Sequence, residues 1–237
     1  MAEKILSGIE GMDELLYGGI PKGKAYLVSG EPGTGKTIFS LQYLLAGAKK
    51  GEKCAYISID EKPEHIIADA ESLGWGITPF LNNGSFQILD ISSYFGKNKF
   101  DKVNVLDTNK IVKNIIQFVR TSKATRLAID PIAPLIFAEK DSLEIIEYIR
   151  KLIYSLEDNL NCTSLLTSYV PVGSAKLSSY GIEEFATSGI ILLKLSKINN
   201  KYIRSLWIRK MRGTRVDLSE YSFEILPRRG IVLRQPI

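Results

Sequence analysis

Apolar runs of strand length alternate with amphipathic segments along the first two thirds of the chain. The apolar runs cover residues 24–29, 54–59, 86–91, 127–129 and 162–167. Between them, apolar positions at helical spacing predict helices over 37–49, 63–73 and 107–123, and a helix of about five turns that begins at the capping pair Asp141 and Glu144. The polar residues 92–105 predict a surface loop. This alternation predicts an α/β fold with a mostly parallel sheet flanked by helices.

The last third of the chain has the pattern of antiparallel hairpins. The runs 190–195 and 202–209 flank the turn residues Asn199 and Asn200, and the runs 223–226 and 231–233 flank a second turn. We therefore expect a C-terminal antiparallel hairpin extension of the sheet. No repeat or linker interrupts the pattern, so residues 1–237 predict a single domain.

The composition narrows the classes of protein to consider. Apolar residues make up 45% of the 237 residues and charged residues 24%, which is typical of a globular domain. The single histidine, His65, excludes metal sites built from several histidines. Cys54 and Cys162 are too far apart for a CxxC motif, and we expect buried thiols. With no signal-peptide pattern and no apolar stretch long enough to span a membrane, we expect a cytoplasmic protein.

The positive charge is concentrated near the C-terminal end. The net charge of the chain is +5, yet residues 194–234 hold eleven basic and three acidic residues. Such a basic end is compatible with nucleic acid, a neighbouring subunit or bound phosphate, and equally with an ordinary solvated β surface.

One segment matches the phosphate-loop motif G-x-x-x-x-G-K-[ST] and lies between a predicted strand and a predicted helix, which is the context that the motif requires. The glycines let backbone N–H groups surround an anion, and the helix N-terminus adds its positive end. Lys36 is expected to reach the β- and γ-phosphates, and the Thr37 hydroxyl to bind Mg²⁺. The predicted nucleotide-binding residues here are Gly30, Glu31, Pro32, Gly33, Thr34, Gly35, Lys36, Thr37 and Ile38.

Three acidic residues at strand ends are candidates for the rest of an ATP site. Asp130 ends an apolar run, as a Walker B aspartate does, and is the second candidate for holding Mg²⁺. Asp60 and Glu61 end another strand, where one carboxylate could orient a water against the γ-phosphate. Their alternative role is to cap the helix that starts at Pro63, and the residues alone favour neither.

Five segments are similar to motifs of KaiC-like ATPases, a group of the RecA superfamily. They are SGIEGMDELLYGGIPKG at 7–23, DEKPEHII at 60–67, SLGW at 72–75, YGIEEF at 180–185 and KMRGT at 210–214. The resemblance extends over about residues 5–235. It implies a RecA-type core and a ring, usually a hexamer, with ATP bound between subunits.

The resemblance also implies roles for single residues. Lys210 and Arg212 are expected to reach the γ-phosphate of the neighbouring subunit's ATP, where a guanidinium stabilises the charge of the transferring phosphoryl group. Ser72 and Thr214 are expected near the nucleotide, and Thr167 and Ser168 as polar sensors of the γ-phosphate.

The chain departs from the family pattern in three respects. Asp60 stands where the catalytic glutamate is usual, so either Asp60 or Glu61 is the base. There is one ATPase domain, where the clock protein has two. Glu184 and Phe185 occupy the place of the phosphorylated Ser-Thr pair, so autophosphorylation of that kind is not expected.

Four functions follow as alternatives. The first is a regulatory or signalling ATPase with a protein partner that the sequence does not name. The second is a RecA/RadA-paralogue that assembles on single-stranded DNA, which is disfavoured because residues 170–179 carry only one basic residue, Lys176. The third is a protein kinase acting in trans, and the fourth a nucleotide-binding scaffold with negligible turnover.

Overall fold

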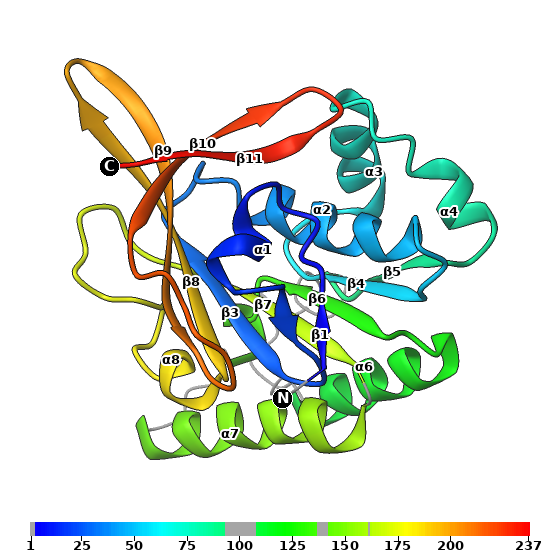
Figure 1. Ribbon diagram of the computed structural model, residues 1–237. Coiled ribbons are helices and arrows are strands. Elements are labelled where there is room, and N and C mark those ends of the chain that lie inside the picture. The colour runs from blue at the N-terminus through cyan, green and yellow to red at the C-terminus, as the bar shows by residue number, and fades with distance from the viewer. Residues whose placement is uncertain (1–2, 93–107, 137–141, 161) are drawn as a thin grey trace.

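The computed structural model describes residues 3–92, 108–136, 142–160 and 162–237, and its centre is a nine-stranded sheet in the order β11-β10-β9-β8-β3-β7-β6-β4-β5 (Figure 1). The six strands from β8 to β5 are mutually parallel. They are β3 (Ala25–Gly30), β4 (Cys54–Ser58), β5 (Phe86–Asp90), β6 (Arg126–Asp130), β7 (Thr163–Tyr169) and β8 (Gly189–Ile198). The parallel part of the predicted sheet is therefore confirmed, and all its C-terminal strand ends meet at one edge.

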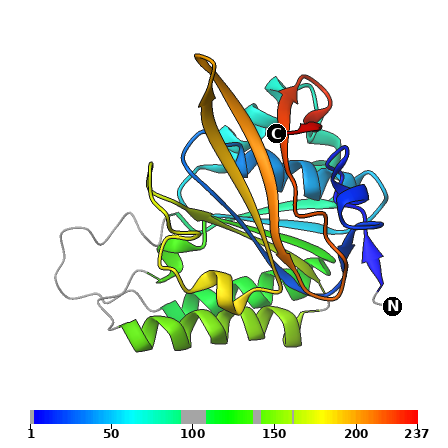
Figure 2. The same ribbon diagram turned by 60° about the vertical axis from the view of Figure 1, so that its left-hand side comes forward.

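Helices cover both faces of this sheet in three layers (Figures 1 and 2). One face carries α2 (Lys36–Ala48) and α3 (Pro63–Ser72), with α4 (Thr78–Asn82) beyond them. The other carries α6 (Thr108–Ser122) and α7 (Ser142–Asn159). The apolar stripe predicted for α6 is confirmed, because Ile111, Ile115 and Val119 are buried.

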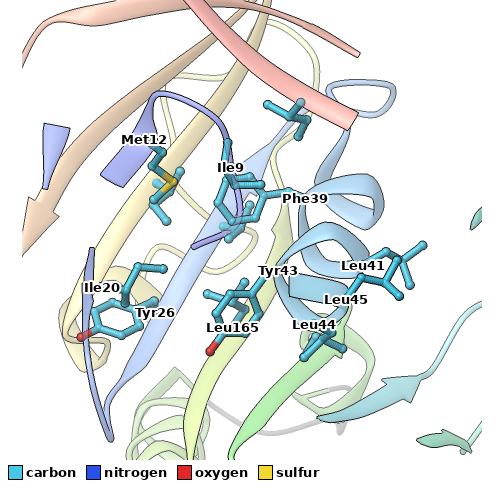
Figure 3. Close-up of a cluster of buried hydrophobic side chains, with 14 of the residues drawn as sticks. Ile9, Met12, Ile20, Tyr26, Phe39, Leu41, Tyr43, Leu44, Leu45 and Leu165 are labelled. Carbon is cyan, nitrogen blue, oxygen red and sulfur yellow. The ribbon is translucent and has the colours of Figure 1, made fainter. Parts of the chain in front are cut away.

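The N-terminal lead-in packs into the core beside the helix that follows the phosphate loop. It contains β1 (Lys4–Ile5), α1 (Met12–Leu15) and β2 (Ile20–Pro21), and β1 pairs with β2. Figure 3 shows Ile9 and Met12 of this segment near Phe39 of α2, and Ile20 beside Tyr26 of β3. All of these side chains are at most 1% exposed. The lead-in thus packs beside α2 and against β3 on the same face of the sheet.

The antiparallel hairpins predicted for the last third are confirmed. Strands β8 and β9 (Lys201–Met211) form a long hairpin, and Asn199 and Asn200 at its turn have φ values of 48° and 62°, the left-handed conformation that a tight two-residue turn requires. Strands β10 (Glu220–Leu226) and β11 (Gly230–Pro236) form the second hairpin, which lies across α2 (Figure 1).

Gln42 of α2 connects three parts of the chain through its buried side-chain amide. Its Nε2 donates to the carbonyl oxygens of Gly8 at 2.9 Å and Arg229 at 3.1 Å, and its Oε1 accepts from the N–H of Ile231 at 2.7 Å. The lead-in, α2 and the second hairpin are therefore joined through one largely buried side chain.

The sequence prediction differs from the structure mainly at element ends. The strand predicted over 162–167 begins at Thr163 and continues to Tyr169, which brings two more residues to the edge that carries the site. Helix α4 was not predicted, because its five residues are too short to show a helical period. Most of the predicted loop 92–105, the predicted first helical residue Asp107 and the predicted cap Asp141 lie outside the described residues. Cys54 and Cys162 are buried free thiols, as expected.

Arg126, at the start of β6, is buried where four segments meet. Its guanidinium pairs with both carboxylate oxygens of Glu52, at 2.7 and 2.9 Å. It also donates to the carbonyl oxygens of Leu6 at 2.9 Å and Tyr43 at 3.0 Å. The planar guanidinium group with its several N–H donors suits this site, because its four hydrogen bonds compensate for the hydration that the buried charge loses. Arg126 therefore links β6 and α2 to the lead-in.

We predict that Arg126→Met lowers the free energy of unfolding by about 2–4 kcal/mol, because Glu52 loses its bidentate partner and the carbonyl oxygens of Leu6 and Tyr43 lose a donor. Urea unfolding followed by circular dichroism measures the change. The matched control is Arg234→Met, which breaks the half-exposed ion pair to Glu224 and should cost less than about 1 kcal/mol. Equal losses in the two variants would contradict the role given to Arg126.

Candidate functional site

The phosphate loop lies between the C-terminal end of β3 and the first turn of α2. Gly33 and Gly35 have φ values of 79° and 103°, which only glycine adopts without strain. At Gly30, a Cβ atom would collide with the carbonyl oxygen of Leu193 on β8. The glycines of the motif are thus required by the conformation of the loop and by its close approach to β8.

Lys36 supplies a positive charge inside the loop. Its Nζ donates to the carbonyl oxygens of Gly30 and Glu31, both at 2.9 Å, and lies 5.0 Å from the centre of the Tyr169 ring. Burial lowers the pKa of Lys36, and the nearby charge of Asp130 opposes that shift. The ammonium group, the loop N–H groups and the start of α2 together form a site suited to an anion.

Asp130, at the end of β6, accepts hydrogen bonds from three elements. Thr37 of α2 donates to its Oδ2 at 2.8 Å, and Tyr56 of β4 donates to the same oxygen at 2.6 Å. Thr167 of β7 donates to Oδ1. Burial and the charge of Asp130 raise the pKa of Tyr56, so its hydroxyl remains a donor.

The hydroxyl oxygen of Thr37 and the carboxylate oxygens of Asp130 are the type of ligand that Mg²⁺ prefers. Water and phosphate oxygens would fill the remaining coordination positions of such an ion. No cluster of three or more histidine, cysteine or acidic side chains suited to a metal occurs within the described ranges.

A cleft of about 380 Å³ opens in front of these groups. It is lined by Pro32, Gly33, Gly35, Lys36, Thr37, Ile38, Glu61, Asp69, Asp130, Tyr169, Arg204 and Ile225. Most of the predicted phosphate-loop residues therefore share one cleft with Asp130 and Glu61, although Gly30, Glu31 and Thr34 are not in its lining. The cleft holds the cations Lys36 and Arg204 and the acidic residues Glu61, Asp69 and Asp130.

Asp60 and Glu61 have different surroundings. The hydroxyl of Tyr169 donates to Asp60 Oδ2 at 3.3 Å, whereas no donor in the described part of the chain bonds to the Glu61 carboxylate. Partial burial raises the pKa of both carboxyl groups; Asp130 adds to the shift at Asp60, and Asp69 and Asp130 add to it at Glu61. A hydrogen bond thus fixes the Asp60 carboxylate, while Glu61 has more freedom.

Ser168 and Ser72 do not line the cleft. Side chains alternate along β7, so Ser168 points away from Thr167, and its hydroxyl bonds to the hydroxyl of Ser179 and to buried Glu183, both at 3.1 Å. Ser72 is exposed at the end of α3 and donates to the carbonyl oxygen of Asp69 at 2.7 Å.

The residues predicted to act on a neighbouring subunit lie near the N-terminal ends of the parallel strands, whereas the phosphate loop lies at their C-terminal ends. They are Lys210, Arg212 and Thr214. Lys210 pairs with Ile190 near the start of β8, whereas Gly30 pairs with Leu193 further along the same strand. The Lys210 ammonium donates to the carbonyl oxygen of Glu184 at 2.7 Å, and burial and the charge of Arg212 lower its pKa.

Arg212 itself is exposed, and Thr214 is hydrogen-bonded to residues of the lead-in. The Thr214 hydroxyl donates to the carbonyl oxygen of Leu16 at 3.0 Å and accepts from Lys4 at 2.6 Å. The structure therefore separates these three residues from the cleft of their own chain.

Sequence reasoning missed four polar side chains around the cleft: Asp69 of α3, which lines it, and Tyr56, Arg204 and Tyr169. Tyr56 lies inside an apolar run, where a hydroxyl that needs a partner was the available signal. Arg204 belongs to the basic C-terminal stretch, and its Nε donates to the carbonyl oxygen of Gly33 at 3.1 Å. Tyr169 reaches the site only because β7 extends two residues beyond Thr167.

Comparisons with known proteins point to one family. A family model described as "ATPase: KaiC" matches residues 5–236. A UPF0273 protein of Thermotoga maritima is 36% identical, with 98% of this chain and 96% of that protein covered, and one of Pyrococcus horikoshii is 34% identical, with 98% and 94% covered.

The circadian clock protein KaiC3 of Synechocystis is 29% identical; the match covers 98% of this chain but 45% of that protein. The crystal structure of a KaiC-like protein from Pyrococcus horikoshii superposes with a TM-score of 0.85 at 33% identity, covering 99% of this chain and all of that one. Within the described ranges, no helix combines the length and apolar character needed to cross a membrane.

Proposed function

The chain belongs to the KaiC ATPase family, and on that premise we propose that it binds ATP with Mg²⁺ and transfers the γ-phosphoryl group to water. The observation that carries the proposal is the convergence of Lys36, Thr37 and Asp130 in one cleft beside a phosphate loop. Lys36 and the loop N–H groups bind the β- and γ-phosphates, and Thr37 and Asp130 hold Mg²⁺. Mg²⁺ would neutralise charge that develops on the phosphate oxygens.

Hydrolysis also needs a carboxylate that orients the attacking water. Asp60 and Glu61 both follow the end of β4, and we assign this role to Asp60 because Tyr169 holds its carboxylate. Thr167 bonds to Asp130 and is suited to respond to the γ-phosphate. Arg204 reaches the loop from β9 and adds a positive charge from the same chain.

We further propose that the site is completed by a neighbouring subunit in a ring, with six subunits as the expected number. Lys210 and Arg212 lie near the start of β8, at the end of the sheet away from their own phosphate loop. About 13 Å of β8 separates residues 189 and 193, which pair with Met211 and Gly30. A basic pair in this position suits a phosphate presented by another subunit, with Thr214 fixing the turn beside it.

The proposed output is regulatory, through protein contacts that follow the nucleotide state. The segment 170–179 is attached to the phosphate loop, because the Glu31 carboxylate accepts from the N–H of Gly173 at 2.9 Å. It is also attached to β7, because Ser179 donates to the carbonyl oxygen of Tyr169 at 2.8 Å. A change at the loop would therefore reach an exposed segment that a partner could contact.

Steady-state ATP turnover of the purified protein, with and without Mg²⁺ and single-stranded DNA at moderate salt, tests the proposal. Mg²⁺-dependent turnover indifferent to DNA supports it. Strong stimulation by DNA would instead favour a recombination role that uses the basic C-terminal residues. Absence of any turnover would instead favour the alternative of a nucleotide-binding scaffold.

We predict that Lys36→Ala abolishes ATP turnover and weakens ATP binding at least 10-fold, because the phosphates lose their buried cation. Isothermal titration calorimetry measures the affinity. Lys22→Ala, which removes a surface lysine paired with Glu3, is the control and should bind as the parent protein does. Parental turnover in Lys36→Ala would refute the phosphate-loop assignment.

Arg212→Ala is expected to bind ATP normally and to lower kcat by roughly 10³-fold or more, because its charge matters mainly in the transition state. Mixing Arg212→Ala with Lys36→Ala subunits tests whether the site is shared. Some mixed interfaces would combine an intact loop with an intact Arg212, so activity should return in part. No recovery at any mixing ratio would argue against a shared site.

Asp60→Asn and Glu61→Gln separate the two candidate bases. We expect Asp60→Asn to lower kcat by roughly 10²–10⁴-fold with little change in ATP affinity, and Glu61→Gln to lower it far less. Single-turnover measurements with bound ATP isolate the chemical step. The reverse order of losses would assign the role to Glu61.

A further inference from the structure

Tyr169 spans the cleft between a cation and a carboxylate. Its ring lies 5.0 Å from the Lys36 ammonium, and its hydroxyl donates to Asp60 Oδ2 at 3.3 Å. The side chain is 39% exposed and lines the cleft, so it borders the space where the phosphates would bind. Strand pairing sets this position, because Tyr169 at the end of β7 lies opposite Gly30 of the phosphate loop.

The charges around the pair keep the Tyr169 hydroxyl protonated. Partial burial raises the pKa of Tyr169, and the charge of Asp60 raises it further, as does that of Asp130 on β6. The other charged groups that line this cleft are Glu61 of the same turn, Lys36 of α2, Asp69 of α3 and Arg204 of β9. Tyr169 is therefore a donor to Asp60 at neutral pH.

We propose that Tyr169 is a positioning residue for ATP hydrolysis, which holds the Asp60 carboxylate in place to orient the attacking water. This inference rests on the proposed function. Aspartate is one methylene shorter than glutamate, so a base at this position depends more on an external group to fix its carboxylate. The aromatic ring also limits the movement of Lys36 on the other side of the cleft.

The hydrogen bond has a second effect, on the proton affinity of Asp60. Burial raises the pKa of Asp60, and the bond from Tyr169 acts against that shift because it favours the charged form. Loss of the hydroxyl should therefore raise the pKa of Asp60. A base with a raised pKa stays protonated to higher pH, so the acidic limb of the kcat profile should move to higher pH.

Tyr169→Phe removes the hydroxyl and keeps the ring beside Lys36. We expect kcat at neutral pH to fall roughly threefold to tenfold, the effect of one partly exposed hydrogen bond to a charged group, with ATP affinity unchanged. The acidic limb of kcat should shift upward in pH. Tyr154→Phe, on the exposed part of α7, is the matched control and should change neither quantity.

A double-mutant cycle distinguishes positioning from a general structural effect. In the Asp60→Asn background, Tyr169→Phe should have no further effect on kcat, whereas in the Glu61→Gln background its effect should persist in full. Full additivity with Asp60→Asn, or an unchanged pH profile in Tyr169→Phe, would overturn the inference.

A readout without nucleotide completes the test. The carboxyl ¹³C resonance of Asp60, assigned by its loss in Asp60→Asn, should titrate at higher pH in Tyr169→Phe than in the parent protein. An identical titration would overturn the inference even if kcat fell. Failure of the proposed function would look different, because the parent protein itself would then hydrolyse no ATP.

Discussion

The hydrogen bonds to the Asp130 carboxylate are the interaction on which the site depends. They join the first turn of α2 through Thr37, the parallel strand β4 through Tyr56 and the end of β7 through Thr167. One carboxylate thereby aligns three elements that are distant in sequence, and it does so next to the loop that would hold the phosphates. A displaced Asp130 would disturb Thr37 and Thr167 together, the residues that we propose as a metal ligand and a γ-phosphate sensor.

The parts of the fold with a local pattern were predictable from the sequence. Helical spacing identified α2 and α6, and Asn199 and Asn200 identified the first hairpin, because these elements are determined by neighbours along the chain. The phosphate loop was recognisable since its glycines and Lys36 are contiguous. The order of strands in the sheet was not, because pairing between parallel strands leaves no local signature.

The same distinction holds within the site. Asp130 could be predicted from the apolar run before it, but Tyr169 and Arg204 become part of the cleft only through strand pairing, with Tyr169 opposite Gly30 and Arg204 beside Phe223. Sequence motifs thus identified the groups expected to contact phosphate and metal. The side chains that orient those groups depend on tertiary contacts, and the structure was needed to find them.

The three-way attachment of Gln42 has a mechanical consequence. Helix α2 begins at the phosphate loop, and one turn and a half later its side-chain amide is bonded to the lead-in at Gly8 and to the second hairpin at Arg229 and Ile231. A displacement of the helix along its axis must either break these bonds or carry both segments with it. A movement of α2 at the phosphate loop would therefore be coupled to segments near both the N-terminal and the C-terminal part of the chain.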